Sequence, residues 1–366
     1  MRFQNRSIYS LAVLIALTVL FCSMSCSDDE ATQEEFPFHE DGIFIVNEGN
    51  FNSGNSSLSF YSFDKNRIYN GLFEKWTGQE LGDVAQSMVI EYNMGYIVVN
   101  NSDKIEMIRI TDGESQGTIE LEQGFSPRDI VFTTYGEKAY ISSLYQNKVA
   151  VIDMDSLTVS GTIPVGNNPE EMELIDGKLY VANSGFGSGN SISVIDTESD
   201  TVIGEIAVGD NPVNLEYTAT LTSGTHLVIL CHGSYNDFDD PNDDTPGQLA
   251  IYDISSESII HTRTIDGHPT DLAVNYPGVG YYILNNKVVS FSVSDCSVIN
   301  DSLIVVDSGA LYSLEAQGGR IFVGNAMDFV SNGKVTVYDE EGVQLFSANV
   351  GVNPGAFAFV GWFTID

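Results

Sequence analysis

The sequence predicts an all-β fold, a seven-bladed β-propeller with four short strands in each blade. A similar unit recurs along the chain, and the prolines that end one of its motifs, Pro127, Pro169 and Pro212, lie 42 and 43 positions apart. A repeat of this length is typical of propellers and solenoids. Within each unit, short segments rich in Val, Ile and Tyr alternate apolar and polar residues, which indicates strands. The last such segment has the pattern that opens a repeat, which indicates a closed ring.

The clearest repeat establishes the order of the strands within a blade. It reads KLYVAN (178–183), a loop rich in Gly and Ser, SISVIDT (191–197) and TVIGEIAVGDNP (201–212), and the preceding repeat has the same order. Asp-Gly and Gly-Asn-Pro pieces between the segments predict turns. We expect the second strands at 43–47, 96–100, 139–143, 179–183, 227–231, 281–285 and 321–325. We expect the third strands at 58–63, 105–110, 149–153, 192–196, 249–253, 288–293 and 335–339.

The two ends of the repeat array are expected to meet in one blade. The globular part opens on a second strand, whereas GAFAFV (355–360) near the C-terminus has the pattern of a first strand. The C-terminal strand should therefore complete the first blade and leave no strand edge open. Loops that lead into first strands share one face of a propeller with loops that join second and third strands. We call this the mouth face and expect a ligand there.

Residues 1–25 have the pattern of a signal peptide. Arg2 and Arg6 supply positive charge, and residues 8–21 form an apolar run. The alternative, a membrane-spanning helix, needs about 20 apolar residues. Ser23-Met24-Ser25-Cys26 resembles the lipobox of bacterial lipoproteins, so Cys26 is the predicted lipidation site, with Cys22 the weaker alternative.

Residues 26–41 are predicted to be an acidic linker, followed by the propeller domain at 42–366. The acidic residues directly after Cys26 resemble a signal that sends some Gram-negative lipoproteins to the outer face of the outer membrane. That resemblance implies a lipid-anchored, surface-exposed protein. The alternative is a solvated acidic tail, which is what charge runs usually form.

The charge excludes two classes of partner. The formal net charge is −36 at pH 7, and loss of Arg2 and Arg6 with the signal peptide takes it to −38. Nucleic acids and anionic lipid surfaces attract proteins through clustered Lys and Arg, which this chain lacks. Cys231 and Cys296 are expected at opposite ends of neighbouring blades, too far apart for a disulfide. No Cys-X-X-Cys pair or zinc-ligand spacing is present.

Aromatic side chains recur on the predicted loops of the mouth face and form the candidate ligand site. Rings offer a large contact area at low entropic cost, and nearby Asn and Ser side chains orient a ligand. The alternative for any one ring is that it packs against the neighbouring blade. The candidate ligand-binding residues are Phe51, Phe125, Tyr145, Phe186, Tyr235, Phe238, Tyr312 and Phe329, with His232 and His268 as auxiliary polar contacts.

One loop of the mouth face is longer than the repeat predicts. Pro212 and Pro269 lie 57 positions apart, and the excess reads SYNDFDDPNDDTPG (234–247). Insertions on one face of a repeat array often bind ligands. Carboxylates are the ligands that calcium prefers, although their order here does not match an EF-hand, and a solvated acidic loop is the alternative. The candidate calcium ligands are Asp237, Asp239, Asp240, Asp243 and Asp244. We expect no other cofactor and identify no catalytic residue.

Two further sets of polar residues recur at fixed places in the repeat, and we interpret both as structural. Side chains of Asn and Asp commonly hydrogen-bond to nearby backbone and so stabilise turns. The first set precedes the first strands and comprises Asn168, Asn211 and Asn353. The second set ends the third strands and comprises Asp153, Asp196, Asp253 and Asp339.

The repeat at 178–212, KLYVANSGFGSGNSISVIDTESDTVIGEIAVGDNP, resembles the YVTN repeat of surface-layer and YncE-like propellers. A surface lipoprotein with such a ring is similar to the BtuG proteins, which capture vitamin B12 and pass it to a TonB-dependent outer-membrane transporter. The resemblance implies a non-enzymatic capture protein with cobalamin as ligand and such a transporter as partner. Two alternatives stay open: a hydrolase or oxidoreductase that holds a metal with His232, His268 and the 237–244 loop, and an adhesion or scaffold module.

Overall fold

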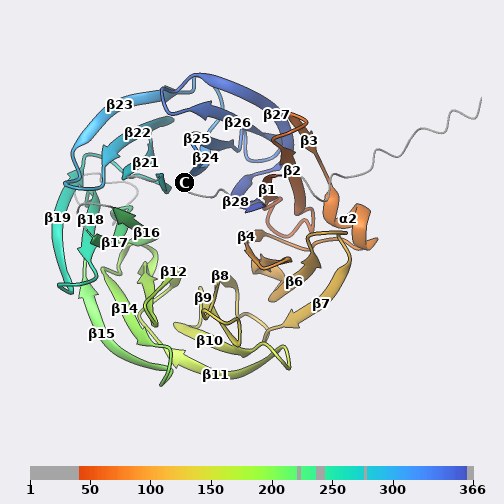
Figure 1. Ribbon diagram of the computed structural model, residues 1–366, viewed down its shortest axis with the longest axis horizontal. Helices are drawn as coiled ribbons and strands as arrows, with labels where there is room; N and C mark the ends of the chain where they lie inside the picture. Colours follow the sequence, from red (N-terminus) through yellow and green to blue (C-terminus); the bar gives the residue numbers. More distant parts are fainter. Residues whose placement is uncertain (1–40, 221–223, 236–243, 276–277, 361–366) are drawn as a thin grey trace, which may run out of the picture. The chain divides into compact units, whose positions relative to one another are not determined.

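The computed structural model describes residues 41–220, 224–235, 244–275 and 278–360, and these residues form a seven-bladed β-propeller (Figure 1). Each blade is an antiparallel sheet of four strands, and the blades surround a central axis. The predicted fold class is therefore confirmed. The predicted signal peptide, Cys26 and nearly all of the predicted linker lie outside the described residues. Among the described residues, no helix is long and apolar enough to cross a membrane.

Within each blade, the four strands are ordered from the axis of the ring to its outer edge. We number the blades by their innermost strands, so that blade 1 begins with β28 and blades 2 to 7 begin with β4, β8, β12, β16, β20 and β24. The innermost strands are β28 (Pro354–Val360), β4 (Ala85–Glu91), β8 (Pro127–Phe132), β12 (Pro169–Ile175), β16 (Pro212–Thr220), β20 (Leu272–Asn275) and β24 (Leu311–Gln317). The second strands are β1 (Gly42–Asn47), β5 (Met94–Val99), β9 (Lys138–Ser143), β13 (Lys178–Asn183), β17 (Gly224–Cys231), β21 (Val279–Leu284) and β25 (Arg320–Asn325). The third strands are β2 (Ser57–Ser62), β6 (Lys104–Arg109), β10 (Lys148–Asp153), β14 (Ser191–Asp196), β18 (Gly247–Asp253), β22 (Lys287–Ser292) and β26 (Asn332–Asp339). The outermost strands are β3 (Arg67–Tyr69), β7 (Ser115–Glu120), β11 (Thr158–Pro164), β15 (Thr201–Ala207), β19 (Ser258–Ile265), β23 (Val298–Val305) and β27 (Gln344–Val352).

The ring closes through the C-terminal strand, as predicted. β28 pairs antiparallel with β1, and the register runs from Gly42 opposite Val360 to Val46 opposite Ala356. Blade 1 therefore combines the last strand of the propeller with its first three. Innermost strands contact one another around the whole ring, including β24 with β28 and β28 with β4. Every innermost strand therefore contacts the innermost strands of the two adjacent blades.

The hydrophobic core lies between the blades. Blades 2 and 3, for example, share a cluster that includes Tyr96, Ile105, Ile130 and Ile141. Second strands such as β9 are buried on both faces, because each blade is covered by a neighbour on either side. Outermost strands such as β15 are exposed along most of their length. The half-buried pattern predicted for every strand is thus too simple for the middle of each blade.

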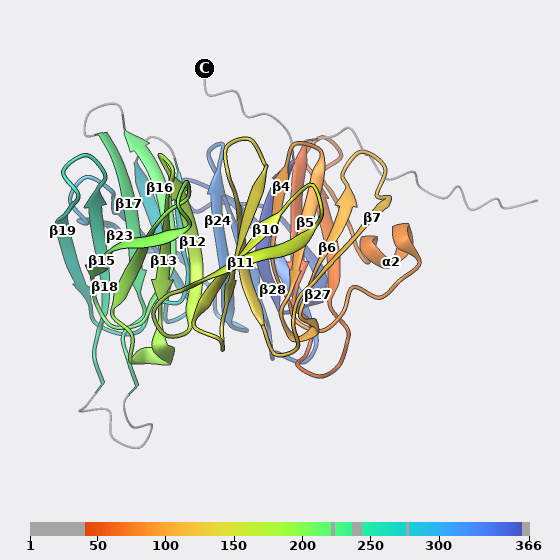
Figure 2. The ribbon, with the colours of Figure 1, turned by 90° about the horizontal axis from the view of Figure 1, so that it is seen from below.

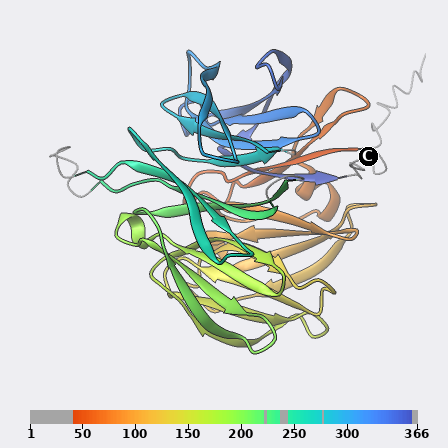
Figure 3. The same ribbon diagram turned by 60° about the vertical axis from the view of Figure 1, so that its left-hand side comes forward.

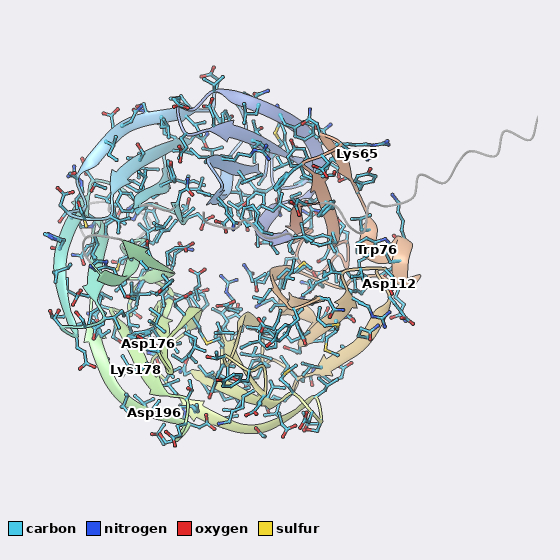
Figure 4. All side chains as sticks on the ribbon, in the orientation of Figure 1. Lys65, Trp76, Asp112, Asp176, Lys178 and Asp196 are labelled. Atoms are coloured by element: carbon cyan, nitrogen blue, oxygen red, sulfur yellow. The ribbon has the colours of Figure 1, made fainter. Side chains whose placement is uncertain are left out.

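One short helix was not predicted. α2 (Leu72–Thr77) follows β3, the shortest outermost strand, and covers the outer side of blade 1 (Figure 4). Trp76 of this helix packs edge-on against Phe44, with 6.1 Å between ring centroids. Gly113 approaches the same indole so closely that an added Cβ would lie 2.3 Å from it. Together with a φ of +72°, this contact requires glycine at that position.

Several local predictions are confirmed. Cys231 and Cys296 are both buried and unpaired. The carboxylates that end the third strands accept backbone N–H groups of the following turn, as Asp153 does from Ser156 at 2.8 Å and Asp253 from Ser256 at 2.7 Å. The hydrogen bond from the backbone N–H of Ser156 lowers the pKa of Asp153, and the side-chain hydrogen bonds of Ser256 and Ser255, with the backbone N–H of Ser256, lower that of Asp253 to about 2. The aspartates therefore cap turns, as predicted.

Candidate functional site

The axis of the propeller encloses a cavity of about 580 Å³. Residues on or directly before the innermost strands of all seven blades line it, and side chains from these strands project toward the centre of the ring (Figure 4). Glu48 and Phe329 also line the cavity, and both lie in loops of the mouth face, between second and third strands. The cavity therefore reaches the mouth face, which is drawn at the lower end of Figure 2 with the short turn η2 (Gly185–Gly187).

A bulge at the start of the innermost strands brings two consecutive side chains to the axis. In β8 the register shifts between Pro127 and Ile130, so that Arg128 and Asp129 lie opposite a single residue of β9. The same shift occurs in β4, β12, β16, β24 and between β28 and the end of β1. Bulges of this kind re-aim side chains next to functional sites. They produce two successive tiers of polar groups around the axis.

The tier nearest the mouth, here the mouth tier, is a hydrogen-bonded network around one guanidinium group. Arg128 donates from Nε to Glu170 Oε2 and from Nη1 to Gln86 Oε1, each at 2.5 Å. Tyr312 donates its hydroxyl to Glu48 Oε2 at 2.7 Å. Burial raises the pKa of Glu48 above its ordinary value, although the hydrogen bond from Tyr312 opposes that shift. The network holds polar groups in place directly beneath the mouth.

The carboxyl groups of the middle tier tie three of the blades to the blade that follows each of them. Asp129 accepts the backbone N–H of Met172 at 2.9 Å, and Asp271 accepts that of Leu314 at 2.6 Å. Glu171 likewise accepts the N–H of Leu215 at 2.8 Å. Burial raises the pKa of Asp129 to about 6 and that of Asp271 to about 7. Each of these carboxyl groups accepts a hydrogen bond from a backbone N–H group of the following blade, so their first role is structural.

Three glutamates at one place in the repeat form a far tier, deeper along the axis. They are Glu173 of β12, Glu216 of β16 and Glu315 of β24, each four positions after the first residue of its strand. Burial raises the pKa of Glu173 to about 8 and that of Glu315 to about 7. The pKa of Glu216 is also raised, first by burial and then by repulsion from Glu315.

The cavity lining is unbalanced in charge. One guanidinium group, that of Arg128, faces seven carboxyl groups. The carboxyl groups belong to Glu48, Asp129, Glu170, Glu171, Glu216, Asp271 and Glu315. Carboxyl groups therefore dominate the interior, and burial raises the pKa of several of them, among them Asp271 and Glu315 at about 7, so that only part of the set is charged at neutral pH. Such a lining supplies acceptors for ligand groups that donate N–H hydrogen bonds, and its ionised carboxylates disfavour anions.

Exposed rings surround the mouth in three groups. Tyr145 and Phe186 lie together, with ring centroids 5.8 Å apart, and are 62% and 61% exposed. Tyr235 covers His268 at 3.8 Å, and Phe329 meets Tyr312 edge-on at 5.8 Å.

Two of these groups are joined, since Gly187, next to Phe186, approaches Ser234, next to Tyr235. Asn50 donates a hydrogen bond to the carbonyl oxygen of Phe329 at 2.7 Å and so brings its own loop to the third group. Phe51, beside Asn50, is 68% exposed.

The structure corrects part of the predicted ring set. Phe125 is only 2% exposed and packs in the core between blades 2 and 3, with the Lys148 ammonium group over its face. The prediction that it contacts a ligand is wrong, because the loop before β8 turns this ring inward. Tyr312 belongs to strand β24 and not to a loop, and it lines the cavity.

Several predicted residues fall on segments that the structure does not describe. They are Phe238, Asp237, Asp239, Asp240 and Asp243. Asp244 is described, and its Oδ1 is buried without a hydrogen-bond partner among the described residues. Within the described ranges, no group of three or more His, Cys, Asp or Glu side chains is arranged to hold a metal ion. The loop segments directly after β17 and directly before β18, on either side of the insertion, extend beyond the neighbouring blades (Figures 2 and 3).

The asparagines before the first strands have the structural role predicted for them. Asn168, Asn211 and Asn353 all have positive φ, at 48°, 59° and 52°. Their amide groups donate to carbonyl oxygens of adjacent mouth-face loops, as Asn353 does to Gly49 at 2.9 Å and Asn168 to Leu144 at 2.7 Å. They connect adjacent loops of the mouth face.

The charged lining of the axis was missed at the sequence level. The prolines that end the repeat motif are followed by charged residues where an ordinary buried strand would be apolar. Arg128 and Glu170 come directly after such a proline, and Asp271 lies one residue further on. Two polar residues in succession at the start of an innermost strand are the signal that could have revealed the tiers. Glu48 could not have been found in this way, because it lies in a loop after β1.

Residues 41–215 match a family model described as Domain of unknown function (DUF5074). No curated protein matches the sequence. Among solved structures, hydrazine synthase of Kuenenia stuttgartiensis is similar with a TM-score of 0.57 and 15% identity, covering 74% of this chain and 88% of that one. Apo AztD of Citrobacter koseri is similar with a TM-score of 0.55 and 10% identity, covering 88% of this chain and 98% of that one. At such identities the likeness shows the propeller fold alone.

Proposed function

We propose that this propeller is a ligand-capture protein that binds a large, flat ligand across the mouth of its axial cavity. The observation that carries the proposal is the cavity of about 580 Å³ together with exposed rings around its opening. Soluble proteins seldom gather large apolar side chains on one face unless that face contacts a ligand or partner. We propose binding and not catalysis, because Arg128, Glu170 and the middle-tier carboxyl groups already have protein partners.

The lining supports a particular ligand chemistry. Rings such as Phe186 and Phe329 would cover the faces of a broad macrocycle, while the acceptors of the mouth tier would bind N–H donors at its edge. A corrinoid combines a flat macrocycle with peripheral carboxamide groups that donate N–H hydrogen bonds. Cobalamin is therefore the ligand that we propose, in agreement with the resemblance to BtuG proteins.

We further propose that the protein acts at the cell surface and passes its ligand to a TonB-dependent transporter. Lipidation of Cys26 would attach the chain to the outer membrane. The described chain enters the ring through β1, whose Gly42 pairs with Val360 at the end of β28. Innermost strands begin at the mouth, so this pair lies at the opposite face. A chain that enters the ring at that face leaves the mouth free for ligand and transporter.

Calorimetric titration with cyanocobalamin tests the capture proposal. Phe186→Ala and Phe329→Ala each remove one exposed ring of the rim, and we expect each to weaken binding by about 30-fold, which corresponds to about 2 kcal/mol for an aromatic anchor. Tyr135→Ala is the matched control, because Tyr135 is 82% exposed in the turn between β8 and β9, on the opposite face.

Two results would contradict the proposal in different ways. No binding by the unaltered protein would exclude the corrinoid and leave capture of some other ligand to be identified. Tight binding that neither rim substitution weakens would place the site away from the mouth.

A further inference from the structure

Two histidines lie beside one another at the rim of the mouth, and each ring is hydrogen-bonded to a backbone carbonyl oxygen. His232 directly follows Cys231, the last residue of β17, and His268 lies in the loop before β20. Nδ1 of His232 lies 2.8 Å from the carbonyl oxygen of Pro269, and Nδ1 of His268 lies 3.1 Å from the carbonyl oxygen of His232. A carbonyl oxygen only accepts, so each Nδ1 must carry the hydrogen. In the neutral rings the lone pair is then on Nε2.

The two rings are neighbours with fixed orientations. Their centroids lie 5.3 Å apart, and the ring of Tyr235 covers His268 at 3.8 Å. Among the described residues, neither Nε2 has a hydrogen-bond partner. Histidines that bind metals usually donate their other ring N–H to a carbonyl or carboxylate in this way, which sets the tautomer and the ring orientation.

We propose that Nε2 of His232 and Nε2 of His268 together bind a transition-metal ion of the zinc, nickel or copper class at the rim. Neutral imidazole suits these ions, whereas calcium and magnesium prefer oxygen ligands. Two protein ligands leave the other coordination positions to water or to a donor atom of an incoming molecule. The strong negative charge of the protein also raises the local concentration of cations. This site goes beyond the capture proposal and does not depend on the identity of the captured ligand.

Substitution by asparagine tests the role of Nε2 separately from that of Nδ1. The Asn amide nitrogen occupies nearly the place of Nδ1, so His232→Asn and His268→Asn can retain the hydrogen bond to the backbone while they remove the metal ligand. Titration of the full-length protein with Zn²⁺ or Ni²⁺ should show one saturable site, and each substitution should weaken it by tenfold or more. His261→Asn is the matched control, because His261 is exposed on β19, away from the mouth.

Cu²⁺ provides a second readout that a structural role would not produce. Electron paramagnetic resonance of the copper-loaded protein should show coupling to two imidazole nitrogens in the unaltered chain and to one in each single variant. Unchanged affinity in the double variant, or copper coordinated by oxygen alone, would overturn the proposal and point to the aspartates of the insertion instead. Cyanocobalamin titrated in the presence of a chelator reports on the capture proposal alone, so the two can fail independently.

Discussion

The far tier of glutamates should make the protein less stable as the pH rises. The pKa of Glu173 is about 8 in the folded protein and has an ordinary value of 4.5. The folded state therefore binds this proton more tightly than the unfolded state does, which stabilises the fold below about pH 4.5. That contribution is lost as the pH rises through about 8. Burial is the main cause, and repulsion from Asp129 adds to it.

Glu173→Gln removes the charge and keeps the shape of the protonated side chain. The difference between about 8 and 4.5 sets a ceiling of about 5 kcal/mol, at about 1.4 kcal/mol per pH unit. Because part of the Glu173 side chain stays exposed, we expect solvent to reduce the effect to about 2 kcal/mol at pH 8.5. For a domain of this size, that corresponds to a rise in Tm of about 3 °C, from about 2.1 cal/mol/K of unfolding entropy per residue.

Differential scanning calorimetry at pH 5 and pH 8.5 measures this difference. We expect Glu173→Gln to raise the Tm at pH 8.5 and to leave it nearly unchanged at pH 5, where the glutamate is already protonated. Glu205→Gln is the control on the same blade, because Glu205 is exposed on the outermost strand β15. A gain that is equal at both pH values, or no gain at pH 8.5, would refute the assignment of a buried, protonated Glu173.

Two further predictions concern the middle tier and the anchor. Asp271→Ala removes the acceptor for the N–H of Leu314 and should lower the free energy of unfolding by about 1–3 kcal/mol in a denaturant titration, the usual cost of an unsatisfied buried donor; a loss below about 0.5 kcal/mol would mean that this tie contributes little. If Cys26 anchors the protein on the outer face of the cell, proteinase added to intact cells should degrade it, whereas protection until the outer membrane is opened would assign it to the periplasm.

The periodic features of the fold were predicted because they depend on neighbours in the chain. A strand such as β13 is recognisable from KLYVAN alone. The spacing of Pro127, Pro169 and Pro212 gives the repeat length, and the seven second-strand segments give the number of blades. Turn aspartates such as Asp196 bond to residues two and three positions away, so their role is also local. Helix α2 was missed because its six residues interrupt the repeat without a helical pattern of their own.

The candidate site was predicted only in outline. The choice of the mouth face followed from the order of strands, and rings such as Phe186 and Tyr145 are exposed there. Phe125 has the same loop position in the sequence, yet its ring is buried, because the packing of two adjacent blades decides which way a loop side chain turns. No property of residues 124–126 by themselves distinguishes the two outcomes.

By itself the sequence determined the number of blades, the order of their strands, the closure of the ring by β28 and the face on which ligands are expected. The tertiary structure alone decided what that face offers. Tyr312 and Glu48 are separated by 264 positions and are joined by a hydrogen bond of 2.7 Å, and Asp129 meets the backbone of Met172 only because blades 3 and 4 are adjacent on the axis. Contacts of this kind arise from ring closure, which brings one residue of each repeat to a common centre. The sequence of a single repeat contains residues of the site but does not show which residues of other repeats they contact.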